Sequence, residues 1–255
     1  MYPKTYSVLY NLYNNVLIAV KINRDVYGEL NSEYIDNNYI KVAIIFDSGY
    51  ESVYYNALPI LKKYNIKANV GLIPSLINEK EYMNYFQISN LYIDGWDVLN
   101  QTYSHKQNMY DYSEKLLEDI KRAQRWMDDN FLNRTSNDVI IPYGEINPYL
   151  LKLLYENNFN SVRTSDNILT LNKSNIQYYQ VKSIHMSANV EIVDVKKLLQ
   201  ESFEAKTTTI LIFNKISENQ DNSKMNFNKS AFSEIVEFLY DNSHKYKVVT
   251  YSNLF

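Results

Sequence analysis

The stretch that indicates the fold is Ile44–Tyr50, which reads Ile-Ile-Phe-Asp-Ser-Gly-Tyr. It is the end of an apolar run, followed by an acidic turn that contains glycine. A strand of a parallel sheet is buried on both faces and is therefore apolar along its length. Enzymes built from alternating strands and helices place their working groups where such strands end. The stretch therefore predicts a buried parallel strand with Asp47 and Ser48 at its functional end.

From Lys41 onward, strand-like and helix-like segments alternate. The apolar segments that predict strands are 42–46, 68–73, 96–99, 139–141, 208–213 and 248–251. Between them, apolar residues recur at helical spacing, most clearly in 53–64, 116–127, 195–203 and 232–239. Repeated βα units predict a parallel sheet covered on both faces. The chain of 255 residues is long enough for a barrel of such units. Periodicity alone leaves an open doubly wound sheet as the alternative.

Residues 1–38 do not follow this rhythm. Residues 8–20 alternate loosely between apolar and polar positions, and residues 31–38 are polar. We expect residues 1–38 to be an N-terminal extension, partly β, that packs on the main domain or docks on another protein. The main domain is then residues 39–255.

Composition excludes several classes of function. A net charge of −3 gives no electrostatic footprint for nucleic acid, and the absence of cysteine excludes disulfides and thiolate metal sites. No stretch of about 18 apolar residues is present, so we expect no membrane insertion. The first residues lack a basic region followed by an apolar one, so we expect no signal peptide. A cytoplasmic protein and a virion-borne protein acting at a cell surface are both compatible with this.

The 25 tyrosines indicate either compositional drift or aromatic platforms for sugars or a partner protein.

Several segments, in order, resemble the motifs of the polysaccharide deacetylases, the NodB-homology or carbohydrate esterase 4 family. The first is Ile44–Tyr50, against T-F-D-D-G-Y, and the others are 95–105, 141–147, 212–214 and 248–254. The third segment has no arginine ahead of Pro142, as in the branch that acts on poly-N-acetylglucosamine. The resemblance runs from about residue 40 to the last residue. It implies an α/β fold, a distorted (β/α) barrel of about seven strands.

The resemblance also implies a chemistry. Family members use one divalent metal such as zinc, held by Asp, His and His, which polarises the acetyl carbonyl and activates water. A second Asp is the base, and a His of the last motif protonates the leaving amine. The base position is Asp47 and the second histidine ligand position is His105, so both are retained. The aspartate ligand position is Ser48, the first histidine ligand position is Gln101, and the acid position is Asn214.

These three substitutions work against the family's reaction. A neutral hydroxyl and an amide are poor ligands for zinc, whose catalytic sites typically use three protein ligands. We therefore expect no bound metal and an inactive, pseudoenzyme-like site. Glu145 and Asp166 could supply replacement carboxylates, although nothing in their spacing demands it.

Three functions remain open. The first is recognition, without cleavage, of an N-acetylated cell-surface or cell-wall polysaccharide, with Tyr143, Tyr103 and Gly144 as substrate-binding residues and Tyr143 as the best stacking candidate. The second is an active N-deacetylase, a hydrolase of non-peptide C–N bonds, with rearranged metal ligands. The third is a structural component of a larger assembly such as a phage tail, with residues 1–38 as its docking arm.

Overall fold

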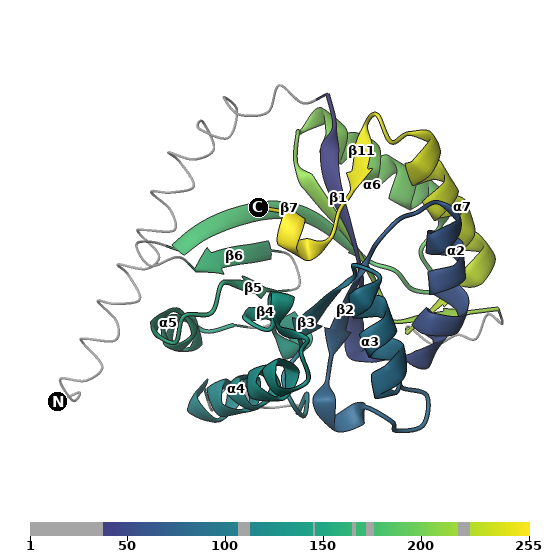
Figure 1. Ribbon diagram of the computed structural model, residues 1–255. Helices are drawn as coiled ribbons and strands as arrows, with labels where there is room; N and C mark the ends of the chain where they lie inside the picture. Colours follow the sequence, from purple (N-terminus) through teal and green to yellow (C-terminus); the bar gives the residue numbers. More distant parts are fainter. Residues whose placement is uncertain (1–37, 107–112, 145, 165–166, 172–175, 219–224) are drawn as a thin grey trace.

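The computed structural model describes residues 38–106, 113–144, 146–164, 167–171, 176–218 and 225–255 (Figure 1). The strands of the main sheet are β1 (Ile40–Phe46), β2 (Asn69–Leu72), β3 (Asp97–Asn100), β4 (Asp138–Ile140), β5 (Ser161–Arg163), β6 (Asn167–Leu171), β7 (Ile176–His185), β8 (Thr208–Phe213) and β11 (Tyr246–Val248). The helices are α2 (Leu58–Lys63), α3 (Tyr85–Ile93), α4 (Ser113–Asp129), α5 (Pro148–Glu156), α6 (Ile192–Glu204) and α7 (Lys229–Asp241). A separate two-stranded sheet contains β9 (Lys215–Ser217) and β10 (Asn226–Asn228).

The main sheet closes on itself because β1 pairs with β8 as well as with β2. The β1–β8 pairing is parallel and runs in register from Val42 opposite Thr209 to Phe46 opposite Phe213. Within the described part of the chain, β1 to β8 thus form a ring of eight strands, one more than expected. All neighbouring pairs in the ring are parallel except those of β6, which runs antiparallel to β5 and β7. The predicted α/β barrel is confirmed, and the open sheet is excluded.

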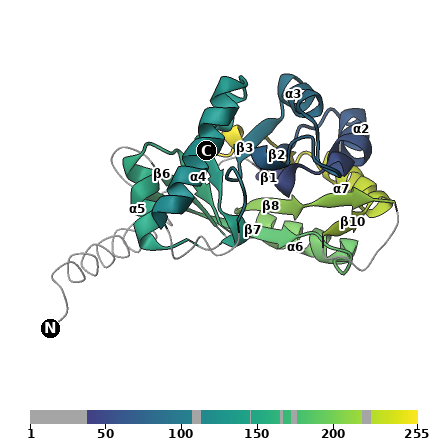
Figure 2. The ribbon, with the colours of Figure 1, turned by 90° about the horizontal axis from the view of Figure 1, so that it is seen from below.

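Helices cover the ring unevenly. Figure 1 and Figure 2 show α2, α3 and α7 on one side, α4 and α5 on another, and β6 and β7 away from the first group. The helical segment predicted at 53–64 begins as a π-helical turn, Val53–Ala57, and continues as α2. The start of α5 is capped by Asn147, whose side chain accepts a hydrogen bond from the Leu150 amide. No helix among the described residues combines the length and apolar composition that crossing a bilayer requires.

The residues of β1 alternate between two hydrophobic clusters. Val42, Ile44 and Phe46 pack outward in the cluster between the ring and the helices. Ala43 and Ile45 point inward, in a cluster with residues of β3, β4, β6, β7 and β8. This alternation explains the uninterrupted apolar run, because both faces of β1 are buried. It also directs the next odd-numbered residue, Asp47, toward the interior of the ring.

The last predicted strand, 248–251, is wrong for most of its length. The strand β11 ends at Val248, and Tyr251–Asn253 forms a short 3-10 helix instead. The backbone amides of Tyr251 and Ser252 donate to the side chains of Asn69 and Asp97, not to a neighbouring strand. The β-prone residues of this segment are therefore used in packing against the ring rather than in extending the sheet.

Phe46 provides a test of the outer core. Its ring lies 5.8 Å from that of Trp96, 5.5 Å from Phe213 and 5.7 Å from Phe232, and it is fully buried. We expect Phe46→Ala to lower the free energy of unfolding by about 3–5 kcal/mol, because it removes apolar contacts and leaves a cavity. Urea unfolding measures this change. Phe86→Ala, at a side chain that is 68% exposed, is the matched control and should change stability by less than about 0.5 kcal/mol.

Candidate functional site

The side chains singled out from the sequence lie at one rim of the ring. Asp47 and Ser48 follow β1, Gln101 follows β3, and Asn214 follows β8. Tyr143 lies in the 3-10 turn Pro142–Gly144 that follows β4. Since these four strands are mutually parallel around the ring, their carboxyl ends meet at the same edge. Phe46 pairs with Phe213, so Asp47 and Asn214 are the first residues beyond two adjacent strands.

Asp47 forms an ion pair with Arg163, the last residue of β5. Nη2 of Arg163 lies 2.8 Å from Oδ1 and 2.7 Å from Oδ2 of Asp47. The two side chains are only 4% (Arg163) and 12% (Asp47) exposed, so little water screens the pair. Nε of Arg163 is buried and has no hydrogen-bond partner among the described residues. The carboxylate retained at the base position is therefore charge-balanced by a cation from the opposite side of the ring.

Ser48 and Gln101 contact each other. The Ser48 backbone amide donates to Oε1 of Gln101 over 2.7 Å, and both residues are buried. Nε2 of Gln101 lies 3.4 Å from Nε2 of His105. The glutamine amide thus links the end of β1 to the histidine, and it uses the oxygen that would have to face a cation.

The loop that carries His105 is held by protein side chains. The Thr102 amide donates to Oδ1 of Asn100, and the His105 amide donates to Oγ1 of Thr102. Ser104 donates to the carboxylate of Asp119 on α4 through both its amide and its hydroxyl. Burial lowers the pKa of His105, with an opposing effect from the Asp47 charge. The imidazole therefore favours its neutral form, as a hydrogen-bonding group.

The three residues expected to bind substrate lie in different settings. Tyr143 is 60% exposed, and its ring lies 5.3 Å from that of His105. Tyr103 is half-buried, and the guanidinium of Arg122 on α4 covers its ring at 3.6 Å. Gly144 closes the turn through its amide, which donates to the Ile141 carbonyl, at a φ of 75°. Tyr143 is thus the open aromatic face of this rim, whereas Tyr103 supports the loop.

Backbone strain gathers at this rim. Four non-glycine residues here have positive φ: 73° at Ser48, 64° at Thr102, 46° at His105 and 61° at Tyr143. Such conformations cost about 1–3 kcal/mol each and persist where the surrounding structure enforces them, often at functional sites. The surrounding structure therefore holds these turns in backbone conformations that are locally unfavourable.

The donor set does not suit zinc. The side chains at the expected ligand positions are the hydroxyl of Ser48, the amide of Gln101 and the imidazole of His105. Within the described ranges, no group of three or more His, Cys, Asp or Glu side chains is placed to hold a metal ion. Glu145 and Asp166, the replacement ligands considered from the sequence, lie outside the described residues. Since a catalytic zinc site typically takes three protein ligands, the described residues do not supply one.

Comparison with known proteins identifies the family of this chain. The model of the family described as Polysaccharide deacetylase matches residues 35–162, half of the chain. The chain belongs to the polysaccharide deacetylase family. A poly-β-1,6-N-acetyl-D-glucosamine N-deacetylase of Staphylococcus epidermidis is 29% identical over 130 residues, which are 46% of this chain and 45% of the relative. The chain thus spans about half the length of the curated relatives it matches.

Solved structures share the fold at low sequence identity. The peptidoglycan deacetylase PdaC from Bacillus subtilis superimposes with a TM-score of 0.54 at 20% identity, covering 86% of this chain and 92% of PdaC. A mutant of BA3943, a carbohydrate esterase 4 pseudoenzyme with restored enzymatic activity, gives a TM-score of 0.52 at 16% identity, covering 86% of this chain and 68% of that protein. Both likenesses support the barrel fold.

Arg163 is the site residue that the sequence motifs missed. It lies in a three-residue strand, Ser161–Arg163, that no motif marks. The available signal was the alternation itself, because Ser161 and Arg163 are polar residues on either side of the apolar Val162. In a buried strand such a pattern indicates one polar face, and here that face is the interior of the ring.

The Asp47–Arg163 pair makes a stability prediction. We expect Arg163→Met to lower the free energy of unfolding by about 3–5 kcal/mol, because it leaves the buried carboxylate of Asp47 without a partner. Chemical unfolding at neutral pH measures this. Lys196→Met, which breaks the exposed pair between Lys196 and Glu234, is the control and should cost less than about 1 kcal/mol. Equal effects of the two substitutions would contradict a buried, unscreened pair.

Proposed function

We propose that this domain binds an N-acetylated polysaccharide at the carboxyl rim of the barrel without metal-dependent deacetylation. The observation that carries the proposal is the hydrogen bond between the Ser48 amide and Gln101 Oε1. Oε1 of Gln101, the atom that would have to coordinate a cation, accepts a backbone hydrogen bond there. The family supports the substrate class, and the name of the staphylococcal relative points to a polymer of N-acetylglucosamine.

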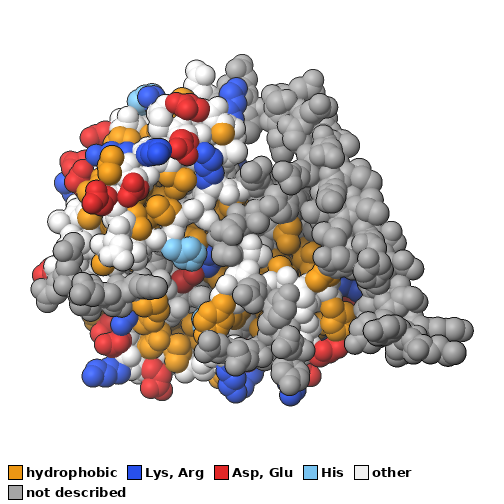
Figure 3. Space-filling view, turned by 180° about the vertical axis from the view of Figure 1, so that it is seen from behind, with side chains coloured by type: hydrophobic (Ala, Val, Ile, Leu, Met, Phe, Trp, Pro, Cys, Tyr) orange, Lys and Arg blue, Asp and Glu red, His pale blue; other side chains and the backbone are white. Residues whose placement is uncertain are grey.

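The charges at the rim favour a neutral ligand. Arg163 balances Asp47, and the side chains of Ser48, Gln101 and Asn214 are neutral. On the face seen in Figure 3, acidic, basic and hydrophobic side chains are intermixed over the described surface. An acetamido group is neutral and offers one carbonyl acceptor and one N–H donor, which match amide and hydroxyl groups. An ammonium group of a deacetylated sugar would lose hydration on binding and would find no unpaired carboxylate here to compensate for that loss.

The binding prediction compares two oligomers of equal length. We expect an N-acetylglucosamine oligomer to bind about 10-fold more tightly than its deacetylated form, a difference of about 1.4 kcal/mol. Titration calorimetry at pH 7 with each oligomer measures this. Tyr143→Ala should weaken binding of the acetylated oligomer about 10-fold through loss of stacking area. Tyr240→Ala, a half-exposed tyrosine near the end of α7, is the control and should leave affinity unchanged. No binding of either oligomer would defeat the proposal.

The chemical prediction concerns the three substituted positions. The wild-type protein should bind no stoichiometric zinc and release no acetate from the oligomer. The variant Ser48→Asp/Gln101→His/Asn214→His should gain zinc binding and chelator-sensitive acetate release, because it supplies the anionic ligand, the second imidazole and an acid. Acetate release by the wild type that stops on chelation, or on Asp47→Asn, would instead establish the active enzyme with rearranged ligands.

We further propose that residues 1–38 form an arm separate from the barrel. The start of β1 at Ile40, directly after the proposed boundary, supports this division. A chain that begins at residue 39 should keep the unfolding transition of the barrel. Size-exclusion chromatography and cross-linking of the two chains test the docking role: a change in assembly on truncation supports it, and identical assembly states would contradict it.

A further inference from the structure

The opposite end of the barrel interior is polar, which is unusual because barrel interiors are filled by layers of mainly branched apolar side chains. The first residues of four successive strands, β2 to β5, are buried and polar: Asn69, Asp97, Asp138 and Ser161. Each brings hydrogen-bonding groups into a region with little water. Such groups are costly unless they find partners inside the protein.

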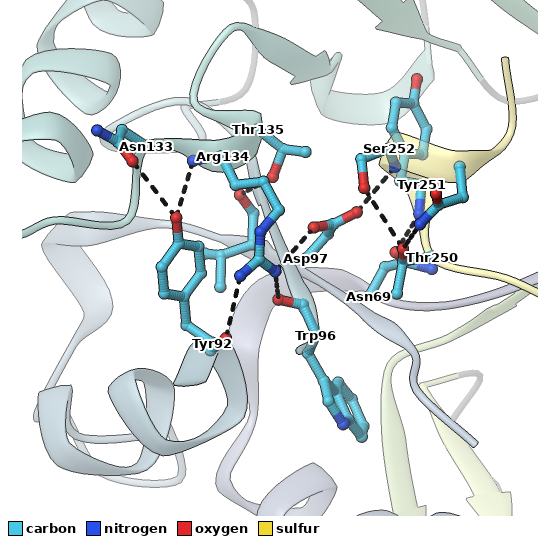
Figure 4. Close-up of polar contacts among 12 residues, drawn as sticks. Asn69, Tyr92, Trp96, Asp97, Asn133, Arg134, Thr135, Thr250, Tyr251 and Ser252 are labelled. Carbon is cyan, nitrogen blue, oxygen red and sulfur yellow. Dashed lines mark hydrogen bonds and ion pairs between the residues drawn. The ribbon is translucent and has the colours of Figure 1, made fainter. Parts of the chain in front are cut away.

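Residues 250–254, here termed the C-terminal plug, supply partners for Asn69, Asp97 and Ser161, and Ser161 in turn bonds to Asp138 (Figure 4). The Tyr251 amide donates to Oδ1 of Asn69 over 2.6 Å, and the Ser252 amide donates to Oδ2 of Asp97 over 2.8 Å. The Tyr251 hydroxyl lies 2.9 Å from Oγ of Ser161. Tyr251 is 1% exposed and belongs to the interior cluster, together with Leu254. The plug thus closes the amino end of the ring and keeps water from its polar layer.

The two buried acids under the plug, Asp97 and Asp138, have different partners. Asp97 pairs with Arg134 over 3.2 Å in addition to the Ser252 amide. Asp138 accepts from the hydroxyl of Ser161 over 2.7 Å and from the side chain of Asn160. No cation lies within ion-pair distance of Asp138 among the described residues.

The charged and titratable groups that face Asp138 offer its carboxylate no compensation. On β3, the charge of Asp97 repels the carboxylate of Asp138. From the plug, the hydroxyl of Tyr251 faces Asp138, and Arg163 of β5 interacts with that same hydroxyl. Burial, the largest cause, and the Asp97 charge raise the pKa of Asp138 from 3.8 to about 6. Its pKa in an opened state, where water reaches it, would return toward the ordinary value.

We propose that the C-terminal plug is a pH-dependent latch, closed most firmly when Asp138 is protonated and opened more readily when Asp138 is ionised. The closed state binds the proton more tightly than the open state, so protonation favours closure. This stabilisation is fully present below the pKa of the open state and is lost as pH rises through about 6. The two pKa values differ by about 2, so the opening equilibrium changes by up to about 100-fold.

Amide hydrogen exchange of the full chain tests the latch. Protection factors of the Tyr251 and Ser252 amides, corrected for intrinsic exchange, should fall by 10- to 100-fold between pH 5 and pH 8. Amides of β2 and β3, such as Val70 and Leu99, are the internal control and should change much less. Unchanged protection of Tyr251 and Ser252 across this range in the wild type would overturn the proposal.

The variant Asp138→Asn assigns the titrating group. Asparagine cannot ionise and can still accept from Ser161, so protection should stay high at both pH values. A pH dependence in Asp138→Asn equal to that of the wild type would exclude Asp138 as the switch. The carboxyl titration of Asp138 followed by NMR in the wild type provides a readout that needs no variant. A midpoint near 4 would also overturn the proposal.

Discussion

The ion pair between Asp47 and Arg163 is the constraint around which the rim is built. It joins β1 to β5, which lie four positions apart in the ring of eight described strands and hence on opposite sides of it. Because both side chains are buried, neither charge is tolerable without the other. The pair fixes the orientation of Asp47 at the carboxyl rim of the barrel. The positive charge of Arg163 balances the negative charge of Asp47. The other polar side chains named at this rim, those of Ser48, Gln101 and Asn214, are neutral hydrogen-bonding groups.

The rim is held by hydrogen bonds between protein groups. The turns are held by Asn100, Thr102 and Asp119, each bonded to the loop that carries His105. The amide of Gln101 takes the amide of Ser48 as its partner, so neither is left as an unsatisfied buried group. The turns at the rim are therefore ordered by contacts among the protein's own side chains and backbone. The proposed binding function depends on that order, with Tyr143 as its open aromatic side chain.

The sequence predicted those parts of the molecule that depend on local patterns. The apolar run of Val42–Phe46 and the helical spacing in the later segments predicted a buried parallel sheet, and the motifs indicated which residues follow its strands. The sequence did not predict Arg163 as a site residue, because its partner, Asp47, lies 116 residues earlier and its strand is only three residues long. Tyr251 was assigned to a strand because its neighbours are β-prone, whereas side chains of β2 and β3 capture the local backbone amides. Both features follow from contacts between distant segments, which periodicity does not encode.

The most direct measurement is anomalous diffraction at the zinc absorption edge from wild-type crystals soaked in a zinc salt. With Asp47 held by Arg163 and Gln101 bonded to the Ser48 amide, no anomalous peak should lie within coordinating distance of Asp47 or His105. The hydrogen bond between Ser48 and Gln101 should remain intact. A fully occupied zinc ion bound beside Asp47 and His105 would contradict the metal-free site and make this protein a hydrolase.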